Sequence, residues 1–411
     1  MRVSRLFVAI VVATAACNDA SGPSAAKRIT ALPRALSSGE QAVIAASNTF
    51  GFALLRELDR TRADSNIFMS PLSASMALGM TMNGAAGKTF DEMRSSLAFG
   101  SQTSAEINQS YRSLIDMLRA LDSKVDFRIA NSIWYRDGFP FESTFLTESQ
   151  QFFDAKVSGL DFSAASASSM INNWVNQSTN GKIDAIVDGP IDPAVVMYLI
   201  NAIYFNGSWT TRFDKAQTRS EAFNSADGTV APIMMMRRTG ELRVAQTPDA
   251  QVIDLAYGGD AYAMTILLPR SGKPIRDVVA GLTGESWQAA VANVATTSVE
   301  LQMPKFTMKW GANLNDPLQA LGMRQAFAAG GADFTRMSQA RGKDLYISVV
   351  KQKSFVDVHE EGTEAAAVTS VEIRETSAPA AIRVDRPFVF AIRERLSGTI
   401  IFLGKIVRPP V

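Results

Sequence analysis

The 411-residue sequence predicts a single α+β domain. Apolar residues at helical spacing dominate the first third of the chain, whereas β-branched and aromatic runs bounded by turn residues dominate the rest. Neither a shift in composition nor an internal repeat divides the chain after residue 40. Because helices come early and strands late, we expect strands to pair over long sequence distances rather than in alternating βαβ units.

The first segment, residues 1–17 (MRVSRLFVAIVVATAAC), is typical of a cleaved export signal. Arg2 and Arg5 precede an apolar run of eleven residues, 6–16, which is too short to span a bilayer. Residues 14–17 (TAAC) resemble a bacterial lipobox, although Thr14 stands where leucine is usual. Cys17 is the only cysteine, so it has no disulfide partner within the chain. We expect an exported protein, either anchored to the cell envelope by a lipid on Cys17 or secreted.

Residues 18–38 are rich in Ser, Ala, Gly and Pro without apolar periodicity, which predicts a flexible tether before a body at residues 39–411. A helix is expected to open at Pro71 with Ser70 as its N-cap. Other helices are expected over residues 42–58, 88–97, 105–121, 168–178 and 315–321. Strands are expected over residues 66–70, 127–135, 195–205, 261–269, 298–304, 345–358 and 388–392.

The composition excludes several classes of function. Lys plus Arg (41) balance Asp plus Glu (40), which argues against a nucleic-acid binder that depends on phosphate contacts. His359 is the only histidine, so a Ser-His-Asp hydrolase would have to use it as the base. A zinc site built from several His and Cys ligands cannot be assembled. A hydrolase based on His359 therefore remains only a minor alternative.

Seven segments resemble motifs of the serpin family in order and spacing. They are residues 66–73 (NIFMSPLS), 201–209 (NAIYFNGSW), 301–306 (LQMPKF), 314–327, 360–367 (EEGTEAAA), 385–390 (DRPFVF) and 402–407 (FLGKIV). The resemblance covers the chain from about residue 40 to 411. It implies a large mixed central sheet, two further sheets, about nine helices and an exposed reactive-centre loop.

The resemblance also assigns residues to two regions of that fold. Ser70, Ser73, Asn201 and Gln352 correspond to the shutter, and Trp209 corresponds to the breach. Gln352 stands where family members usually carry histidine. Its amide can donate and accept hydrogen bonds, toward Ser70 or Asn201 for example, but it does not titrate.

Residues 360–377 have the pattern of a strand. Alternate positions from Thr363 are small or apolar, and the interleaved positions hold every charge before Glu375. No proline interrupts residues 362–376, and Gly362 stands where a hinge must change its dihedral angles. By themselves these residues favour an ordinary late strand. The resemblance instead implies a loop that inserts into the central sheet, as serpin loops do. Its hinge and inserting strand comprise Glu360, Gly362, Thr363, Ala365, Ala366, Ala367, Thr369, Val371 and Ile373.

The family's spacing places the scissile bond sixteen residues after Glu360, at Thr376–Ser377. Arg374–Glu375 is the alternative and would favour trypsin-like enzymes. A small β-branched Thr376 suits serine proteases of elastase-like or subtilisin-like specificity, with cysteine proteases as further candidates. The resemblance thus implies a suicide inhibitor rather than an enzyme. It is expected to be a monomer with no cofactor, metal or nucleic acid, and to meet a membrane only through the lipid anchor. A serpin-fold carrier or binding protein without inhibitory activity is the alternative.

Overall fold

The computed structural model describes residues 28–363 and 380–410, and this part of the chain has the expected α+β composition. It contains two β-sheets, nine α-helices and two short 3₁₀ helices, η1 (Lys215–Gln217) and η2 (Gln325–Phe327). The α-helices are α1 (Ser38–Thr61), α2 (Pro71–Met82), α3 (Gly87–Ser96), α4 (Ser104–Leu121), α5 (Ser143–Phe153), α6 (Ala167–Ser178), α7 (Ile275–Ala280), α8 (Gly284–Ala292) and α9 (Asn315–Ala320).

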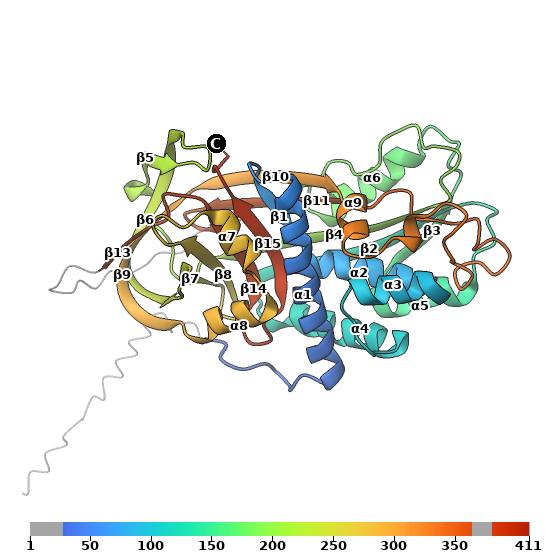
Figure 1. Ribbon diagram of the computed structural model, residues 1–411, viewed down its shortest axis with the longest axis horizontal. Coiled ribbons are helices and arrows are strands. Elements are labelled where there is room, and N and C mark those ends of the chain that lie inside the picture. Colours follow the sequence, from blue (N-terminus) through green and yellow to red (C-terminus); the bar gives the residue numbers. More distant parts are fainter. Residues whose placement is uncertain (1–27, 364–379, 411) are drawn as a thin grey trace, which may run out of the picture.

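Six strands form a mixed sheet, the central sheet, whose long strands run lengthwise through the molecule (Figure 1). Its spatial order is β10 (Phe306–Asn313), β11 (Lys351–His359), β12 (Gly362–Thr363), β4 (Met197–Ser208), β2 (Val125–Arg136) and β3 (Lys156–Leu160). Only the pairing of β2 with β3 is parallel. The strand β12 has two residues, yet it lies between two long strands.

The remaining strands account for the two further sheets that the resemblance implied, and they are joined into one nine-stranded sheet. Its members are β1 (Ile67–Met69), β15 (Ile400–Ile406), β14 (Phe388–Glu394), β8 (Tyr262–Pro269), β7 (Ala250–Tyr257), β6 (Val230–Gln246), β9 (Ala295–Pro304), β13 (Ala380–Arg383) and β5 (Arg219–Asn224). The 17-residue strand β6 joins the two expected parts, because it pairs with β5 and β9 along most of its length and with β7 at its end.

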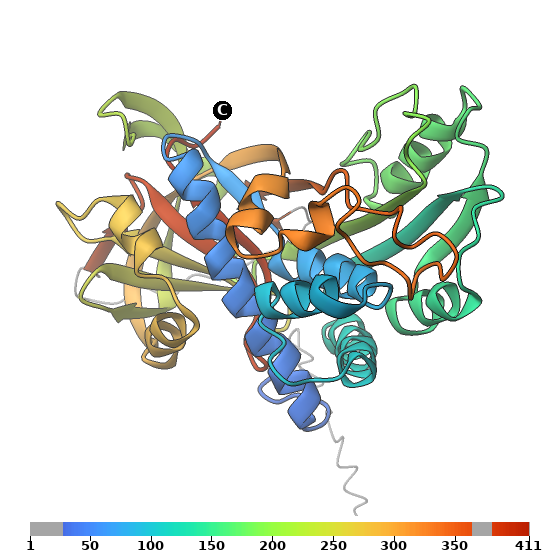
Figure 2. The same cartoon turned by 45° about the vertical axis from the view of Figure 1, so that its right-hand side comes forward.

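Helices α1 and α2 show how local sequence determines the packing of one helix on another. Ser37 and Glu40 form a capping box at the start of α1, and Ser70 caps α2 by accepting a hydrogen bond from the backbone of Ser73, as predicted. The helices cross closely at Gly51, where an added Cβ would lie 2.6 Å from the Cβ of Pro71. Glycine is therefore required inside α1 for contact with α2, and Figure 2 shows α1 crossing the molecule beside the shorter helices.

The predicted strand over residues 345–358 begins only at Lys351. In the preceding residues Leu345 is buried, and the backbone N–H of Ile347 donates to the carbonyl of Ala326 at 2.8 Å. Leu345, Ile347 and Val350 thus pack against the core instead of pairing in a ladder, whereas Tyr346 and Val349 are exposed. Periodicity alone does not distinguish such packing from a strand. Helices α5, α7 and α8 were not predicted.

The last residues of the predicted tether contact the body. The backbone N–H of Ile29 donates to Gly259 at 2.7 Å, and Arg34 forms an ion pair with Glu40 and a 2.8 Å hydrogen bond with the Ser113 hydroxyl. The apolar side chains at 29, 32 and 36 pack against the main core. The packed chain therefore begins before residue 39.

Helix α6 packs on the central sheet with a small apolar core of its own, which includes Ile171 and Val175 of α6, Trp134 of β2 and Ile200 of β4. The segment that follows α6 adds Ile183, Ile186, Val187 and Ile191 to this core. The structure therefore ties residues 183–191 to the half of the central sheet that contains β2 and β4.

Candidate functional site

The hinge predicted at residues 360–363 lies within the central sheet. Glu360 and Glu361 form the turn between β11 and β12, and β12 pairs with β11 on one side and with β4 on the other. Thr363 lies opposite Val358 of β11 and Gly207 of β4. Within the described residues, β12 is the only ladder connection between β11 and β4. The chain thus enters the gap between two long strands immediately before the residues predicted to insert.

Gly362 can be only glycine in this conformation. Its φ angle is +154°, and an added Cβ would lie 2.3 Å from the carbonyl oxygen of Gly207 and 2.6 Å from the Cα of Ser208. Both neighbours are backbone atoms of β4, so neither can move aside without breaking the ladder. The sequence suggested that this glycine provides conformational freedom. The structure adds a second requirement, which is the close approach of β12 to β4.

Thr363 is held by an aromatic pair. Its hydroxyl lies 2.7 Å from the hydroxyl of Tyr257, and both side chains are buried. Tyr257 stacks on Trp209 with ring centroids 4.3 Å apart, and the Trp209 indole N–H donates to the carbonyl of His359 at 2.8 Å. Burial raises the pKa of Tyr257 well above its usual value, although the hydrogen bond with Thr363 opposes this. The phenol therefore stays protonated and can donate to Thr363.

Glu360 is buried at the turn and is held by charge. Lys305 forms an ion pair with its carboxylate at 2.9 Å, and the Thr218 hydroxyl donates to it at 2.8 Å. Burial alone would raise the pKa of Glu360, but the hydrogen bonds from Lys305, from its own backbone and from Thr218 outweigh it and lower the pKa. The neighbouring Glu361 forms an ion pair with Lys215 at 2.7 Å. Lys305 and Lys215 therefore stabilise the ionised carboxylates of Glu360 and Glu361 in this turn.

The residues assigned to the shutter come from the start of α2, from β4 and from β11, and hydrogen bonds link them in one cluster. The Gln352 side-chain amide donates to the carbonyl of Ser70 at 3.0 Å, and its oxygen accepts from the Ser70 N–H at 3.2 Å. The Ser70 hydroxyl donates to the carbonyl of Ile401 at 2.6 Å. Ser73 donates to the side chain of Asn201. The Gln352 amide thus both donates to and accepts from the backbone of Ser70. Asn201 instead accepts a hydrogen bond from Ser73.

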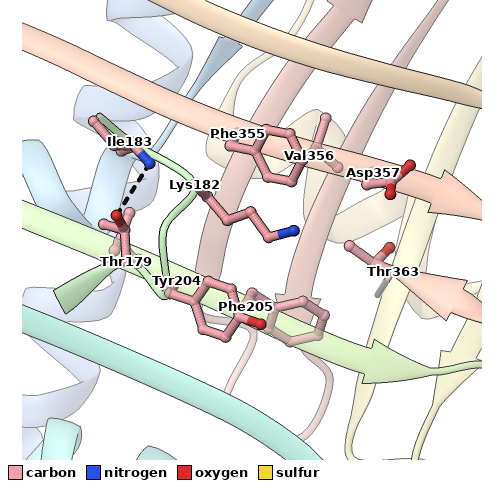
Figure 3. Close-up of a pocket in the computed structure, with 10 residues that line it drawn as sticks. Thr179, Lys182, Ile183, Tyr204, Phe205, Phe355, Val356, Asp357 and Thr363 are labelled. Atoms are coloured by element: carbon pink, nitrogen blue, oxygen red, sulfur yellow. Dashed lines mark hydrogen bonds between the residues drawn. The ribbon is translucent and has the colours of Figure 1, made fainter. Parts of the chain in front are cut away.

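Between these two clusters, β4 and β11 border a narrow gap, which we call the slot (Figure 3). It has Thr363 at one end, and its lining includes Tyr204 and Phe205 of β4, Phe355 and Val356 of β11, and Lys182. The cavity volume is about 10 Å³, roughly that of one water molecule. Side chains therefore fill the slot, and a strand could enter only if its borders moved apart.

Sequence reasoning missed three residues that hold the hinge: Tyr257, Lys305 and Thr218. Lys305 lies in the LQMPKF segment, but nothing in that segment indicates a contact with Glu360, which is 55 residues away. Tyr257 is 106 residues from Thr363. The predicted positions outside the described residues are Cys17, Ala365, Ala366, Ala367, Thr369, Val371, Ile373, Arg374, Glu375, Thr376 and Ser377.

Comparison with known proteins identifies the family. The sequence model of the family "Serpin (serine protease inhibitor)" matches residues 45–409. The chain belongs to the serpin family. A serpin-like protein of Thermococcus kodakarensis is 34% identical over 377 residues, covering 90% of this chain and 86% of that protein. Human neuroserpin is 33% identical over 369 residues, covering 87% and 89% of the two chains.

A solved serpin structure is similar to this chain throughout its length. Human thyroxine-binding globulin in complex with thyroxine has a TM-score of 0.83 at 28% identity, and the match covers 91% of this chain and all of that one. Serpins are generally protease inhibitors rather than enzymes. In residues 28–363 and 380–410 of this serpin, no cluster of three potential metal-ligating side chains occurs. No helix in the same ranges is both long and apolar enough to cross a membrane.

Proposed function

We propose that this serpin inhibits serine proteases as a suicide substrate whose cleaved loop enters the slot between β4 and β11. The observation that carries the proposal is β12, because Gly362 and Thr363 already pair with both strands that would flank the inserted segment. Extension of an existing two-residue strand avoids the first and least favourable step of strand addition. In that step a segment loses conformational entropy before it has formed most of its contacts.

The register of β12 supports insertion of the residues that follow. Continuing it two residues at a time would place Ala365 between Phe205 and Val356, Ala367 between Ile203 and Ser354, and Thr369 between Asn201 and Gln352. These partners are buried, apart from the half-buried Asn201. The small residues of the predicted inward face would therefore meet the core, and Thr369 would reach the polar shutter cluster, where its hydroxyl could find partners.

The reaction begins at the proposed Thr376–Ser377 bond. The protease serine Oγ attacks the carbonyl carbon of Thr376, and the bond to the Ser377 nitrogen breaks as that amine leaves with a proton. The protease then carries the Thr376 acyl group, and the freed strand is drawn into the slot with the enzyme attached. Distortion of the enzyme before water attacks the ester would trap the complex. The serpin thus supplies a substrate bond and stored free energy, not catalysis.

Incubation of the exported domain with pancreatic-type elastase and with subtilisin tests the proposal. We expect a band stable to denaturation at the summed mass of protease and serpin less the released peptide 377–411, and no such band with protease inactivated at its serine. Mass spectrometry of the released C-terminal peptide locates the bond: a peptide that begins at Ser377 supports the main assignment, whereas one that begins at Glu375 supports Arg374–Glu375. Cleavage by every protease without a stable complex would contradict inhibition.

A carrier function is the second candidate, because a cavity of about 350 Å³ opens beside α8. Its wall combines apolar residues of the α8 end, Val291, Ala292 and Val294, with the charged side chains of Arg393 and Arg395. This volume lies in the range of small-molecule sites, and thyroxine-binding globulin shows that the fold can carry a ligand. Saturable binding of thyroxine by equilibrium dialysis, together with cleavage that gives no protease complex, would favour a carrier.

Export through residues 1–17 and lipidation of Cys17 complete the proposal, with the domain acting as a monomer outside the cytoplasm. Labelling of a producing bacterial culture with a radioactive fatty acid tests the anchor. We expect the label on the wild-type protein and not on Cys17→Ser. Release of unlabelled wild-type protein into the medium would show that the protein is secreted without an anchor.

A further inference from the structure

One arginine of β6, Arg238, has no carboxylate partner although several carboxylates lie nearby. Three glutamates around the hinge each hold a different cation, in the ion pairs Arg237–Glu300 (3.0 Å), Lys305–Glu360 (2.9 Å) and Lys215–Glu361 (2.7 Å). Arg238 takes part in none of these pairs, and within residues 28–363 and 380–410 no other carboxylate forms an ion pair with it. Its positive charge is therefore left over after the neighbouring charges have paired.

Arg238 is half-buried beside residues 209–213, the segment that follows β4. Its guanidinium carbon lies 5.3 Å from the centroid of the Phe213 ring, and the guanidinium donates a hydrogen bond to the carbonyl of Thr211. A guanidinium carries five N–H donors, so one bond leaves most of them unused. None of the Arg238 nitrogen atoms is both buried and without a partner, so the unused donors face solvent. The side chain is thus fixed on one side and open to a ligand on the other.

The surroundings of Arg238 favour the binding of an anion. Burial lowers the pKa of Arg238 to about 10, and no opposite charge counters this effect. The guanidinium is still protonated at neutral pH, but it has lost part of its hydration without gaining an ion pair. A carbonyl oxygen and a ring face each offer only partial negative charge. An oxyanion offers full charge and can accept two parallel N–H bonds from the planar guanidinium.

Residues 209–213 connect Arg238 with the hinge turn. The backbone N–H of Trp209 donates to the carbonyl of Glu361 at 2.9 Å, and the backbone N–H of Phe213 donates to the carbonyl of Glu360 at 3.0 Å. The rings of Trp209 and Phe213 meet edge to face, with centroids 6.1 Å apart. An anion that holds the guanidinium against Phe213 would therefore restrain the segment to which the turn between β11 and β12 is hydrogen-bonded.

We propose that Arg238 forms a site for a small oxyanion, such as phosphate or a carboxylate, and that an anion bound there stabilises residues 209–213 against the hinge turn. The neighbouring Arg237 is already paired with Glu300, so the site depends on Arg238. Phosphate carries more charge than acetate and should bind more tightly. The site belongs to the uncleaved fold and does not depend on the proposed inhibitory function.

Thermal unfolding of the intact protein in sodium phosphate and in NaCl of equal ionic strength tests the site, because charge screening is the same in both. At a tenfold excess of phosphate over its dissociation constant, the wild-type midpoint should rise by about 1–3 °C. Sodium acetate should give a smaller rise. Phosphate also stabilises folded proteins by its exclusion from their surface. The effect of the site is therefore the difference between the wild type and a variant that lacks the guanidinium.

Arg238→Gln is the main variant and should lose the part of the phosphate shift that exceeds surface exclusion. Arg238→Lys keeps the charge but not the planar pair of donors, and it should bind phosphate several-fold more weakly. Arg270→Gln is the matched control. Arg270 also donates to a backbone carbonyl, that of Thr247 at 2.7 Å, but its side chain is exposed. Arg270→Gln should keep the full wild-type shift.

Hydrogen exchange measured by mass spectrometry adds a local readout. Phosphate should slow the exchange of the Trp209 and Phe213 N–H groups in the wild type and leave it unchanged in Arg238→Gln. Broadening of the phosphorus-31 resonance of phosphate measures binding directly, and it should be weaker with Arg238→Lys than with the wild type.

Equal phosphate shifts in the wild type and Arg238→Gln would overturn the inference, as would loss of the shift in Arg270→Gln. If Arg238→Gln does not fold, equal broadening by the wild type and Arg238→Lys would overturn it. All of these measurements use uncleaved protein without a protease, so failure of the site leaves the proposed function standing.

Discussion

Replacement of Tyr257 by phenylalanine should lower the stability of the hinge, because the loss of one hydroxyl group leaves a second, buried hydroxyl without this partner. The Tyr257 hydroxyl lies 2.7 Å from Thr363, and both residues are at most 4% exposed. Tyr257→Phe keeps the ring stacked on Trp209 but leaves the Thr363 hydroxyl buried without this partner. An unsatisfied buried hydroxyl costs about 1–3 kcal/mol. For a domain of this size, that cost lowers the midpoint of thermal unfolding by about 1–4 °C.

A double-mutant cycle separates the hydrogen bond from the other consequences of each substitution. Thr363→Val leaves the Tyr257 phenol unsatisfied and should cost a similar amount. The double variant removes both polar groups and should be less destabilised than the sum of the two single variants by about 1 kcal/mol or more.

Urea unfolding of the uncleaved protein, followed by circular dichroism, provides the free energies for the cycle. Covalent complex formation with the protease provides a second measurement, because a loosened hinge should also change the fraction of encounters that ends in a complex. Costs that add to within about 0.3 kcal/mol would show that Tyr257 and Thr363 do not interact in solution, and the proposed hold on the hinge would be refuted.

Three further predictions concern the same strands. Thr363→Arg should turn the inhibitor into a substrate, because a guanidinium cannot be buried beside Tyr257 without a charged partner. Denaturing gels would then show cleavage without complex, and unchanged inhibition would contradict insertion. The pKa of Glu360 is lowered in the folded protein. Its ionised form therefore stabilises the fold at pH values above the ordinary pKa of 4.5, and this contribution is lost as the pH falls through the lowered pKa. The difference in melting midpoint between wild type and Glu360→Gln should therefore shrink from pH 7 to about pH 3. Gln352→Leu should destabilise the protein by about 1–3 kcal/mol in urea, because it leaves the buried Ser70 N–H without this partner and removes one of the two hydrogen bonds to the Ser70 carbonyl, which still accepts from the Ala74 N–H. Gln352→Glu should retain only the bond that the Ser70 N–H donates.

Much of the fold could be predicted from local patterns. The helix that opens at Pro71 with Ser70 as its cap, the long amphipathic helices and the seven predicted strands lie close to where periodicity and turn residues placed them, whereas β3, β5, β6, β7, β10, β13 and β15 were not predicted. The failures have a common cause. Within residues 345–350, Leu345, Ile347 and Val350 pack against the core instead of pairing in a ladder, and the continuity of the nine-stranded sheet depends on β6 pairing with partners from distant parts of the chain. Neither fact is encoded within a window of a few residues.

The hinge shows the same division. The sequence indicated Gly362 and Thr363, because a glycine followed by small alternating residues is visible locally. It gave no sign of Tyr257, of the Lys305 contact with Glu360, or of the contacts that lysines of β10 and β11 make with residues 184–188 after α6. These contacts join residues that are between 55 and 168 positions apart.

Local sequence by itself therefore determined many of the helices and strands, the glycine at which the hinge changes direction, and the segment with the alternation needed for insertion. Only the tertiary structure decided that Gly362 and Thr363 already lie between β11 and β4, and that Tyr257, Lys305 and Thr218 hold the hinge there. The physical reason is that alternation and conformational freedom are properties of consecutive residues. Strand order, burial and ion pairing depend on which distant surfaces the whole chain brings together.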